Sequence, residues 1–205
     1  MPTMKRLNLS RALVLVPACA LVAVASCSSS TSPPLSAYIT STLGTNPANL
    51  ASTMGCTIDE PGASYFTVGT LNGQTPDPVP SGSTQMGNPV MINCEVASNG
   101  SGGYDVDLEV NLGMVGAISL FGTLTDSLQP QSTVNASFTT AAGASAITYS
   151  SPSTSPCVVT LSPLENPAIT AGRVWGSMVC DILTDAEVGA TCLGTATFLF
   201  QECSE

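Results

Sequence analysis

Residues 104–112 of this 205-residue chain, "YDVDLEVNL", give the clearest indication of its fold class. Its apolar side chains occupy alternate positions, and acidic or amide side chains fill most of the positions between them. Successive side chains of a β-strand point to opposite faces of a sheet, so this alternation predicts a strand with one buried and one solvated face. Such a strand is typical of an antiparallel sheet that packs on one side only.

The remainder of residues 55–205 repeats this kind of pattern. Short runs rich in Val, Ile, Thr, Phe and Tyr are separated by Gly, Pro, Asn and Ser, and no long run has the period of a helix. We therefore predict an all-β fold, an antiparallel β-sandwich of about nine strands reinforced by disulfides. The dipeptide Asn99-Gly100 predicts a hairpin turn before the quoted strand. The candidate strands are 63–70, 89–97, 104–112, 116–124, 132–139, 144–151, 156–162, 170–180 and 192–202.

The N-terminal residues have the shape of a secretory signal. Three basic residues precede an uncharged run from Ala12 to Ala25, which is shorter than the roughly 20 residues that a membrane-spanning helix needs. The run ends in "VASC", which resembles the lipobox of bacterial lipoproteins. This resemblance implies that cleavage follows Ser26 and that the thiol of Cys27 carries lipid. The alternative is a plain secretory signal with Cys27 as an ordinary residue.

These features predict three segments. Residues 1–26 are the lipoprotein signal peptide, 27–54 a flexible tether rich in Ser, Thr and Pro, and 55–205 the β-sandwich domain. A serine rather than an aspartate follows Cys27, which favours the outer membrane over the inner one by resemblance to enterobacterial sorting. We therefore expect an exported protein, lipid-anchored at the outer membrane or cell surface, whose membrane contact is made through the N-terminal lipid.

The composition excludes several classes of function. Fourteen acidic residues face four basic ones, and Arg173 is the only basic residue after the signal, so we expect no nucleic-acid partner. The chain has no histidine, which removes the usual general base and the commonest metal ligand. We expect a non-enzymatic binding or structural module with no cofactor, whose ligand the sequence does not identify. The alternatives are a carbohydrate- or calcium-binding module and a carboxylate-dependent hydrolase.

Six cysteines follow Cys27, and none of their spacings is the C-x-x-C of zinc or redox sites. An even number in an exported protein predicts three disulfides, for which fifteen pairings are possible. We expect Cys180 to pair with Cys192 across a hairpin, and the rival is Cys157 with Cys180. The six are Cys56, Cys94, Cys157, Cys180, Cys192 and Cys203.

The quoted strand also contains the main candidate metal ligands. Asp105, Asp107 and Glu109 share one face at steps of about 7 Å. A calcium ion would need further oxygens from neighbouring loops, so we interpret these residues as a solvated face and keep calcium as the weaker alternative. The acids of a later loop lack the glycine and terminal glutamate of an EF-hand, and we expect them to be solvated too: Asp181, Asp185 and Glu187.

Two further candidate residues are the one tryptophan and the one basic residue of the expected mature chain. Trp175 is the chain's one tryptophan, and we expect it to pack in or beside the core, with a ligand-stacking platform as the alternative. Arg173 is expected to pair with a structural carboxylate rather than to bind an anionic ligand.

Several segments resemble known lipoproteins. "VMINCEV", "ISLFGTLTD", "AITYSS" and "TATFLFQECS" resemble small actinobacterial lipoprotein antigens, and this resemblance implies a disulfide between Cys94 and Cys203. The ending "AGRVWGSMVC…TCLGTATFLFQEC" resembles uncharacterised lipoproteins of predatory soil bacteria. Both resemblances imply an envelope-bound domain, and neither implies an enzyme activity.

Overall fold

The computed structural model describes residues 32–45, 56, 64–140, 146–187 and 189–205. These residues form a twelve-stranded sheet, whose strand pairs are antiparallel, and two small two-stranded ribbons. The predicted all-β class is therefore confirmed. Within the described ranges, no helix is long and apolar enough to cross a bilayer. The expected signal peptide and Cys27 lie outside the described residues.

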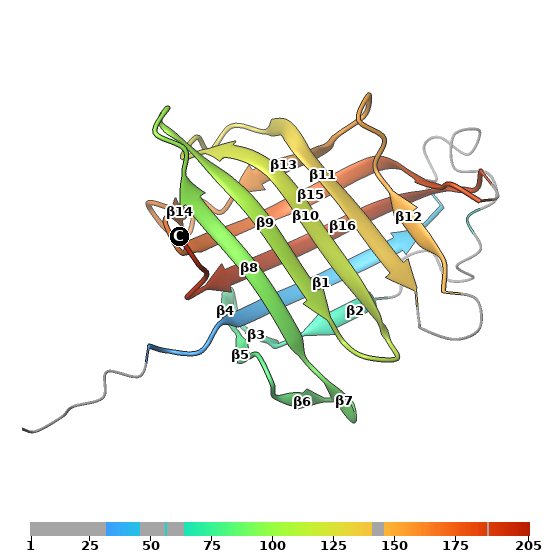
Figure 1. The fold of residues 1–205 in the computed structure, drawn as a ribbon, viewed down its shortest axis with the longest axis horizontal. Helices are drawn as coiled ribbons and strands as arrows, with labels where there is room; N and C mark the ends of the chain where they lie inside the picture. Colours follow the sequence, from blue (N-terminus) through green and yellow to red (C-terminus); the bar gives the residue numbers. More distant parts are fainter. Residues whose placement is uncertain (1–31, 46–55, 57–63, 141–145, 188) are drawn as a thin grey trace, which may run out of the picture. The chain divides into compact units, whose positions relative to one another are not determined.

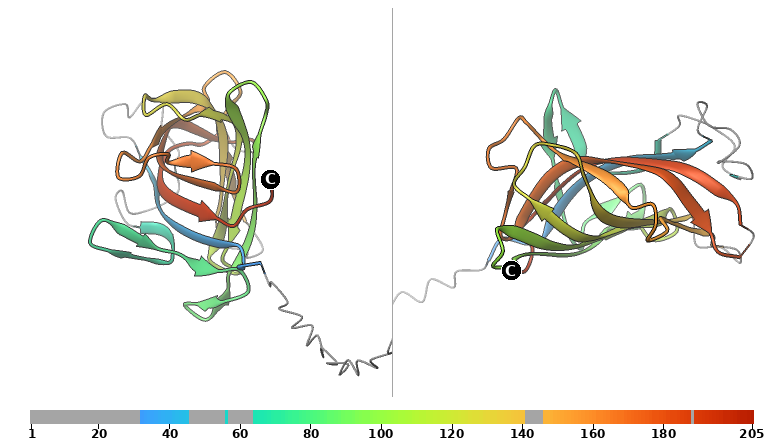
Figure 2. Two further views of the ribbon diagram at one scale, coloured as in Figure 1. Left: turned by 90° about the vertical axis from the view of Figure 1, so that its left-hand side faces the viewer. Right: turned by 90° about the horizontal axis from the view of Figure 1, so that it is seen from above.

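The main sheet folds back on itself into two layers whose strands cross (Figure 1). Figure 2 shows the two layers edge-on. The front layer consists of β8 (Met91–Ser98), β9 (Gly103–Asn111), β10 (Gly116–Thr125) and β11 (Gln131–Thr140). The back layer consists of β13 (Cys157–Leu161), β15 (Arg173–Asp185), β16 (Thr191–Gln201), β1 (Ser36–Gly44) and β2 (Ser64–Val68).

The layers are joined along one side, because β13 pairs with both β11 and β15. The short strand β12 (Thr148–Ser150) makes a second link between β11 and β15. Two other short strands extend the back layer: β14 (Ile169–Thr170) pairs with β15, and β5 (Val79–Pro80) pairs with β1. The expected sandwich is thus one continuous sheet in two layers, with more strands than the nine predicted.

Each of the nine predicted strands corresponds to an observed one, and β9 shows why. Its apolar residues Val106, Leu108 and Val110 are buried, while the acidic side chains between them face away from the core. The preceding turn is the predicted hairpin turn. The side chain of Asn99 holds it, because its Oδ1 accepts hydrogen bonds from the backbone N–H groups of Ser101 and Gly103.

Residues 36–44 correct one prediction. They were expected to belong to the flexible tether, yet they form β1, which lies between β2 and β16 and pairs with β16 along its whole length. The segment is rich in Ser and Thr like a tether, but these polar residues alternate with Ile39 and Leu43, which are buried in the core. A strand whose outer face carries hydroxyl groups therefore has nearly the composition of a linker. Residues 46–54 of the expected tether lie outside the described residues.

Three disulfides tie the strands together. Cys56 is bonded to Cys192, Cys94 to Cys203, and Cys157 to Cys180. The expected pairing of Cys180 with Cys192 is wrong, and the rival pairing of Cys157 with Cys180 is the one observed.

The strand registers explain this correction. In the pairing of β15 with β16, Cys180 lies opposite Gly194, whereas Cys192 lies opposite Leu183, so the two cysteines are not partners across the hairpin. On the other side of β15, the β13–β15 register sets Val158 opposite Val179, which places Cys157 opposite Cys180. Three disulfides are typical of proteins exported to an oxidising compartment.

Candidate functional site

A hydrophobic row of three residues crosses the outer surface of the back layer. Tyr38 of β1 lies opposite Leu199 of β16, and Leu199 lies opposite Trp175 of β15. These three residues form a hydrophobic cluster of their own, separate from the main core between the layers. The expectation that Trp175 packs in or beside the core is consistent with this cluster, because its side chain is only 9 % exposed.

A hairpin outside the sheet covers part of this row. It consists of β3 (Thr70–Asn72) and β4 (Thr75–Asp77), and it follows Gly69, whose φ of 78° permits the chain to turn over the back layer. A Cβ atom at Gly69 would lie 3.3 Å from the Tyr38 ring and 2.7 Å from a backbone oxygen of Asp77. The base of the hairpin therefore packs closely against Tyr38, and burial raises the pKa of this tyrosine above its usual value.

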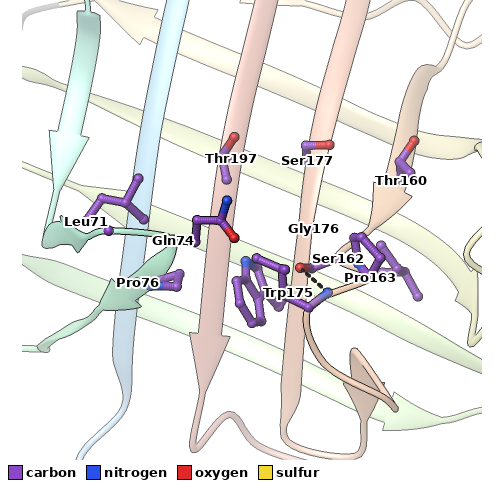
Figure 3. A pocket seen from close by; sticks show the side chains of 13 residues that line it. Leu71, Gln74, Pro76, Thr160, Ser162, Pro163, Trp175, Gly176, Ser177 and Thr197 are labelled. Carbon is purple, nitrogen blue, oxygen red and sulfur yellow. Dashed lines mark hydrogen bonds between the residues drawn. The ribbon is translucent and has the colours of Figure 1, made fainter.

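A pocket of about 380 Å³ opens between this hairpin, the loop after β13 and the face of β15 and β16. Figure 3 shows Leu71, Gln74 and Pro76 of the hairpin on one side, Ser162 and Pro163 on the other, and Trp175 between them. No described residue that lines the pocket carries a charge. The lining residues are Leu71, Gly73, Gln74, Pro76, Thr160, Leu161, Ser162, Pro163, Leu164, Trp175, Gly176, Ser177 and Thr197.

Hydroxyl groups line the pocket beside the hydrophobic row. Thr160, Ser177 and Thr197 lie opposite one another on β13, β15 and β16, and Thr40 of β1 continues this hydroxyl row. Among the described residues, no hydrogen bond engages the side chains of Thr160, Ser177 or Thr197. The same holds for the amide of Gln74 and the indole N–H of Trp175. The pocket therefore offers several free hydrogen-bonding groups around an apolar floor.

A second hollow of about 210 Å³ adjoins the pocket on the same face. The two share Ser177 and Thr197 as lining residues, so they form one extended surface. The second hollow adds Thr42 and Thr195, whose hydroxyl oxygens lie 2.7 Å apart in a hydrogen bond. We call the two hollows together the back-face site.

The acidic residues singled out in the sequence lie on the opposite layer. Asp105, Asp107 and Glu109 project from the outer face of β9, and Glu95 of β8 lies opposite Asp107. Asp105 accepts a hydrogen bond of 3.0 Å from the hydroxyl of Thr123 on β10. Among the described residues, no three acidic or cysteine side chains are gathered as metal ligands. The structure thus spaces these carboxylates along a strand and does not gather them around a position that a metal ion could occupy.

Two of the three acids expected in a later loop, Asp181 and Asp185, belong instead to β15, which extends to Asp185. Asp181 and Glu187 are exposed as expected, but the expectation that Asp185 is solvated is wrong, because this residue is buried. Its Oδ1 accepts a hydrogen bond of 2.8 Å from the N–H of Glu187. Asp185 and Glu187 also line a hollow of about 210 Å³ beside β12. Arg173 forms an ion pair with Glu165, as the sequence predicted.

Comparison with protein families, with curated proteins and with solved structures finds no match to this chain. The candidate site is therefore defined by its own geometry.

Sequence reasoning identified Trp175 but missed the residues around it. Leu71, Gln74 and Pro76 belong to a hairpin that was not predicted, although Asn72-Gly73 is a turn signal. The hydroxyl row is visible in the sequence only as Thr195-Ala196-Thr197 in one strand. Its partners on neighbouring strands become apparent only once the strand registers are known.

Proposed function

We propose that this protein is an exported lipoprotein, held at the outer membrane or cell surface by lipid on Cys27, whose β domain is a non-enzymatic binding module. The observation that carries the proposal is the pairing of the six later cysteines among themselves. Cys27 is thus the odd cysteine of the expected mature chain, and it stands where "VASC" resembles a lipobox. An odd cysteine in an exported chain calls for a separate role, and acylation supplies one.

The chemistry of the back-face site supports binding rather than catalysis. Its lining holds hydroxyl, amide and indole groups, with no carboxylate, amine or thiol among the described residues. General acid–base catalysis requires a group that exchanges a proton near the working pH, and the hydroxyls and indole of this surface are not such groups.

The competing hydrolase hypothesis would use carboxylates elsewhere on the domain. The acidic pair with the best-defined surroundings is Asp185 with Glu187, beside the hollow at β12. Replacing each by its amide would abolish turnover of a hydrolase, whereas a binding module would at most show altered affinity. We favour the binding module because the larger of these two hollows is lined, among the described residues, by uncharged side chains.

The test is an intact-mass measurement and a non-reducing peptide map of the protein purified from its own membranes. We expect an N-terminal Cys27 that carries two or more acyl chains, together with the three observed disulfides. Two acyl chains hold a protein firmly on a membrane, whereas a single chain binds only marginally. An unmodified N-terminus, or cleavage at another position, would overturn the lipoprotein proposal.

A further inference from the structure

The back-face site has the dimensions of a groove for an elongated ligand rather than a closed cavity for a compact one. The pocket and the second hollow share Ser177 and Thr197 and together extend across β1, β16 and β15. The pocket alone falls within the range of about 300–1,000 Å³ that is typical of small-molecule sites. Leu71 and Leu164 line the pocket and are 53 % and 57 % exposed, although both are large apolar residues.

The lining excludes a charged ligand. The described residues of both hollows include no basic side chain that could bind an anion. The nearby guanidinium of Arg173 is already paired with the Glu165 carboxylate. The described part of the lining also lacks the carboxylates that a cation would require. A neutral ligand remains.

The free polar groups exclude a purely apolar ligand. Trp175 is more than nine-tenths buried as a residue, but its indole N–H remains accessible and has no partner among the described residues. In Figure 3 the indole nitrogen lies on the side of Gln74 and Thr197. An apolar ligand over these groups would bury hydrogen-bonding atoms without partners, at a cost of about 1–3 kcal/mol each. The ligand must therefore itself donate and accept hydrogen bonds.

A peptide strand is also a poor match. Extended peptides commonly bind by adding a strand to a free sheet edge, where main-chain groups are available. The back-face site lies on the face of β1, β16 and β15, and the backbone groups of β16 are paired with both neighbouring strands. Side chains rather than backbone groups are therefore available for hydrogen bonds at this site. Such a surface suits a ligand with many hydroxyl groups around its edge.

We propose that the back-face site binds a neutral, linear oligosaccharide. A sugar ring is amphipathic, since its C–H face is apolar and its rim carries hydroxyls. One ring packs in the pocket against Trp175, and its hydroxyls bond to Thr160, Ser177 and Thr197 at the spacing of neighbouring strands, about 4.8 Å. The chain continues into the second hollow at Thr195. This inference rests on the proposed binding function and names the class of its ligand.

The full chain, purified from its membranes in detergent, provides a direct assay. Trp175 is the chain's single tryptophan, so its fluorescence reports specifically on the pocket. The probes are cellohexaose, chitohexaose and mannohexaose, with an oligogalacturonate as the charged control and a proline-rich decapeptide as the rival class. We expect saturable binding of at least one neutral hexasaccharide, weaker binding of its disaccharide, and no binding of the two control compounds.

Three threonine substitutions then locate the site. Thr160→Val and Thr197→Val remove a hydroxyl without changing side-chain volume, and each is expected to weaken binding about 2- to 10-fold. Thr184→Val is the matched control, because Thr184 is a half-buried threonine of the same layer that lines neither hollow. It is expected to leave the affinity unchanged. Calorimetry repeats each measurement without relying on fluorescence.

Specific outcomes overturn the inference. One is that no neutral hexasaccharide binds at millimolar concentration while Trp175 fluorescence shows a folded domain. Others are equal affinities for all three variants, or tighter binding of the proline-rich peptide or the oligogalacturonate. Failure of the proposed lipoprotein function is detected separately, by the mass of the N-terminus. If the chain is not acylated but binds the sugar, the lipoprotein proposal fails and the oligosaccharide inference stands.

Discussion

Cys94 of β8 is bonded to Cys203, with their Cα atoms 4.9 Å apart, and this bond joins the last strand of the front layer to the chain end that leaves the back layer. Hydrogen bonds reinforce it, since the N–H of Ser204 donates to Cys94 O and the N–H of Val96 donates to Ser204 O. These contacts occupy backbone groups on the outer edge of β8. An exposed edge strand can pair with a strand of another chain. The C-terminal residues therefore link the two layers and also block edge-to-edge association at β8.

Removal of this disulfide should destabilise the domain more than removal of the bond between Cys157 and Cys180. The two bonds span sequence separations of 109 and 23 residues, and in the chain-entropy model the longer loop gains more. We expect paired Cys→Ala substitutions to lower the free energy of unfolding by about 5 kcal/mol for Cys94 with Cys203 and about 3 kcal/mol for Cys157 with Cys180. Urea unfolding followed by tryptophan fluorescence measures both. The reverse order would contradict the chain-entropy account.

Gly194 of β16 is required by the packing between the layers. A Cβ atom there would lie 2.4 Å from a methyl carbon of Leu183 and 3.0 Å from the ring of Phe138. We expect Gly194→Ala to lower the free energy of unfolding by about 1–3 kcal/mol, because both neighbours are fully buried. Ser177→Ala, at an exposed position of the adjacent strand, is the control and should change it by less than about 0.5 kcal/mol. Equal effects of the two changes would show that the core tolerates the extra methyl group.

The sequence predicted the strands wherever one face is apolar and the other polar. The strand around Leu108 is recognisable because acidic residues alternate with buried aliphatic ones. The strand β1 was missed because its outer face carries hydroxyls, and Ser and Thr are equally common in linkers.

The candidate site could not be predicted from local sequence patterns, for a different reason. Trp175, Thr197 and Gln74 come from separate parts of the chain and meet only through strand pairing and the fold of a hairpin. The disulfide pairing had the same difficulty, since the registers of β15 with β13 and with β16 determine which residue lies opposite Cys180. Local sequence can specify which residues form strands, but register is set by the turns and bulges of the whole sheet.

Replacing one acidic residue on the outer face of the front layer by a basic one should stabilise the domain. Glu95 and Asp107 are exposed and lie directly opposite each other on β8 and β9, where like charges are destabilising. We expect Glu95→Lys to raise the free energy of unfolding by about 0.5–1 kcal/mol at low salt, and less in 1 M salt, where the Debye length is about 3 Å.

Asp126→Lys is the control for this change, because it lies in an exposed position at the end of β10 and alters the net charge by the same amount. If the two variants gained equally, general charge reduction rather than the cross-strand pair would be responsible. A stabilisation of the unaltered protein by calcium, absent with magnesium, would contradict the interpretation of this face as solvated.

Tyr65 of β2 should make the domain sensitive to alkali. Its hydroxyl donates a hydrogen bond to the backbone oxygen of Thr139 on β11, and burial, with a smaller contribution from Tyr149, raises its pKa well above the usual value of 10. The unfolded chain therefore loses this proton first as the pH rises past 10. Stability that is fully present below pH 10 is then lost by up to about 1.4 kcal/mol per pH unit.

The variant Tyr65→Phe separates the two contributions of this residue. At pH 8 it should lower the free energy of unfolding by about 1 kcal/mol, because the hydrogen bond is lost. Between pH 10 and 12 it should lose less further stability than the unaltered protein, because the variant has no phenol to ionise there. Urea unfolding in freshly adjusted buffers gives both values, and absorbance at the tyrosinate band follows ionisation directly. Parallel losses in the two proteins above pH 10 would mean that Tyr65 ionises as readily in the folded domain as in the unfolded chain.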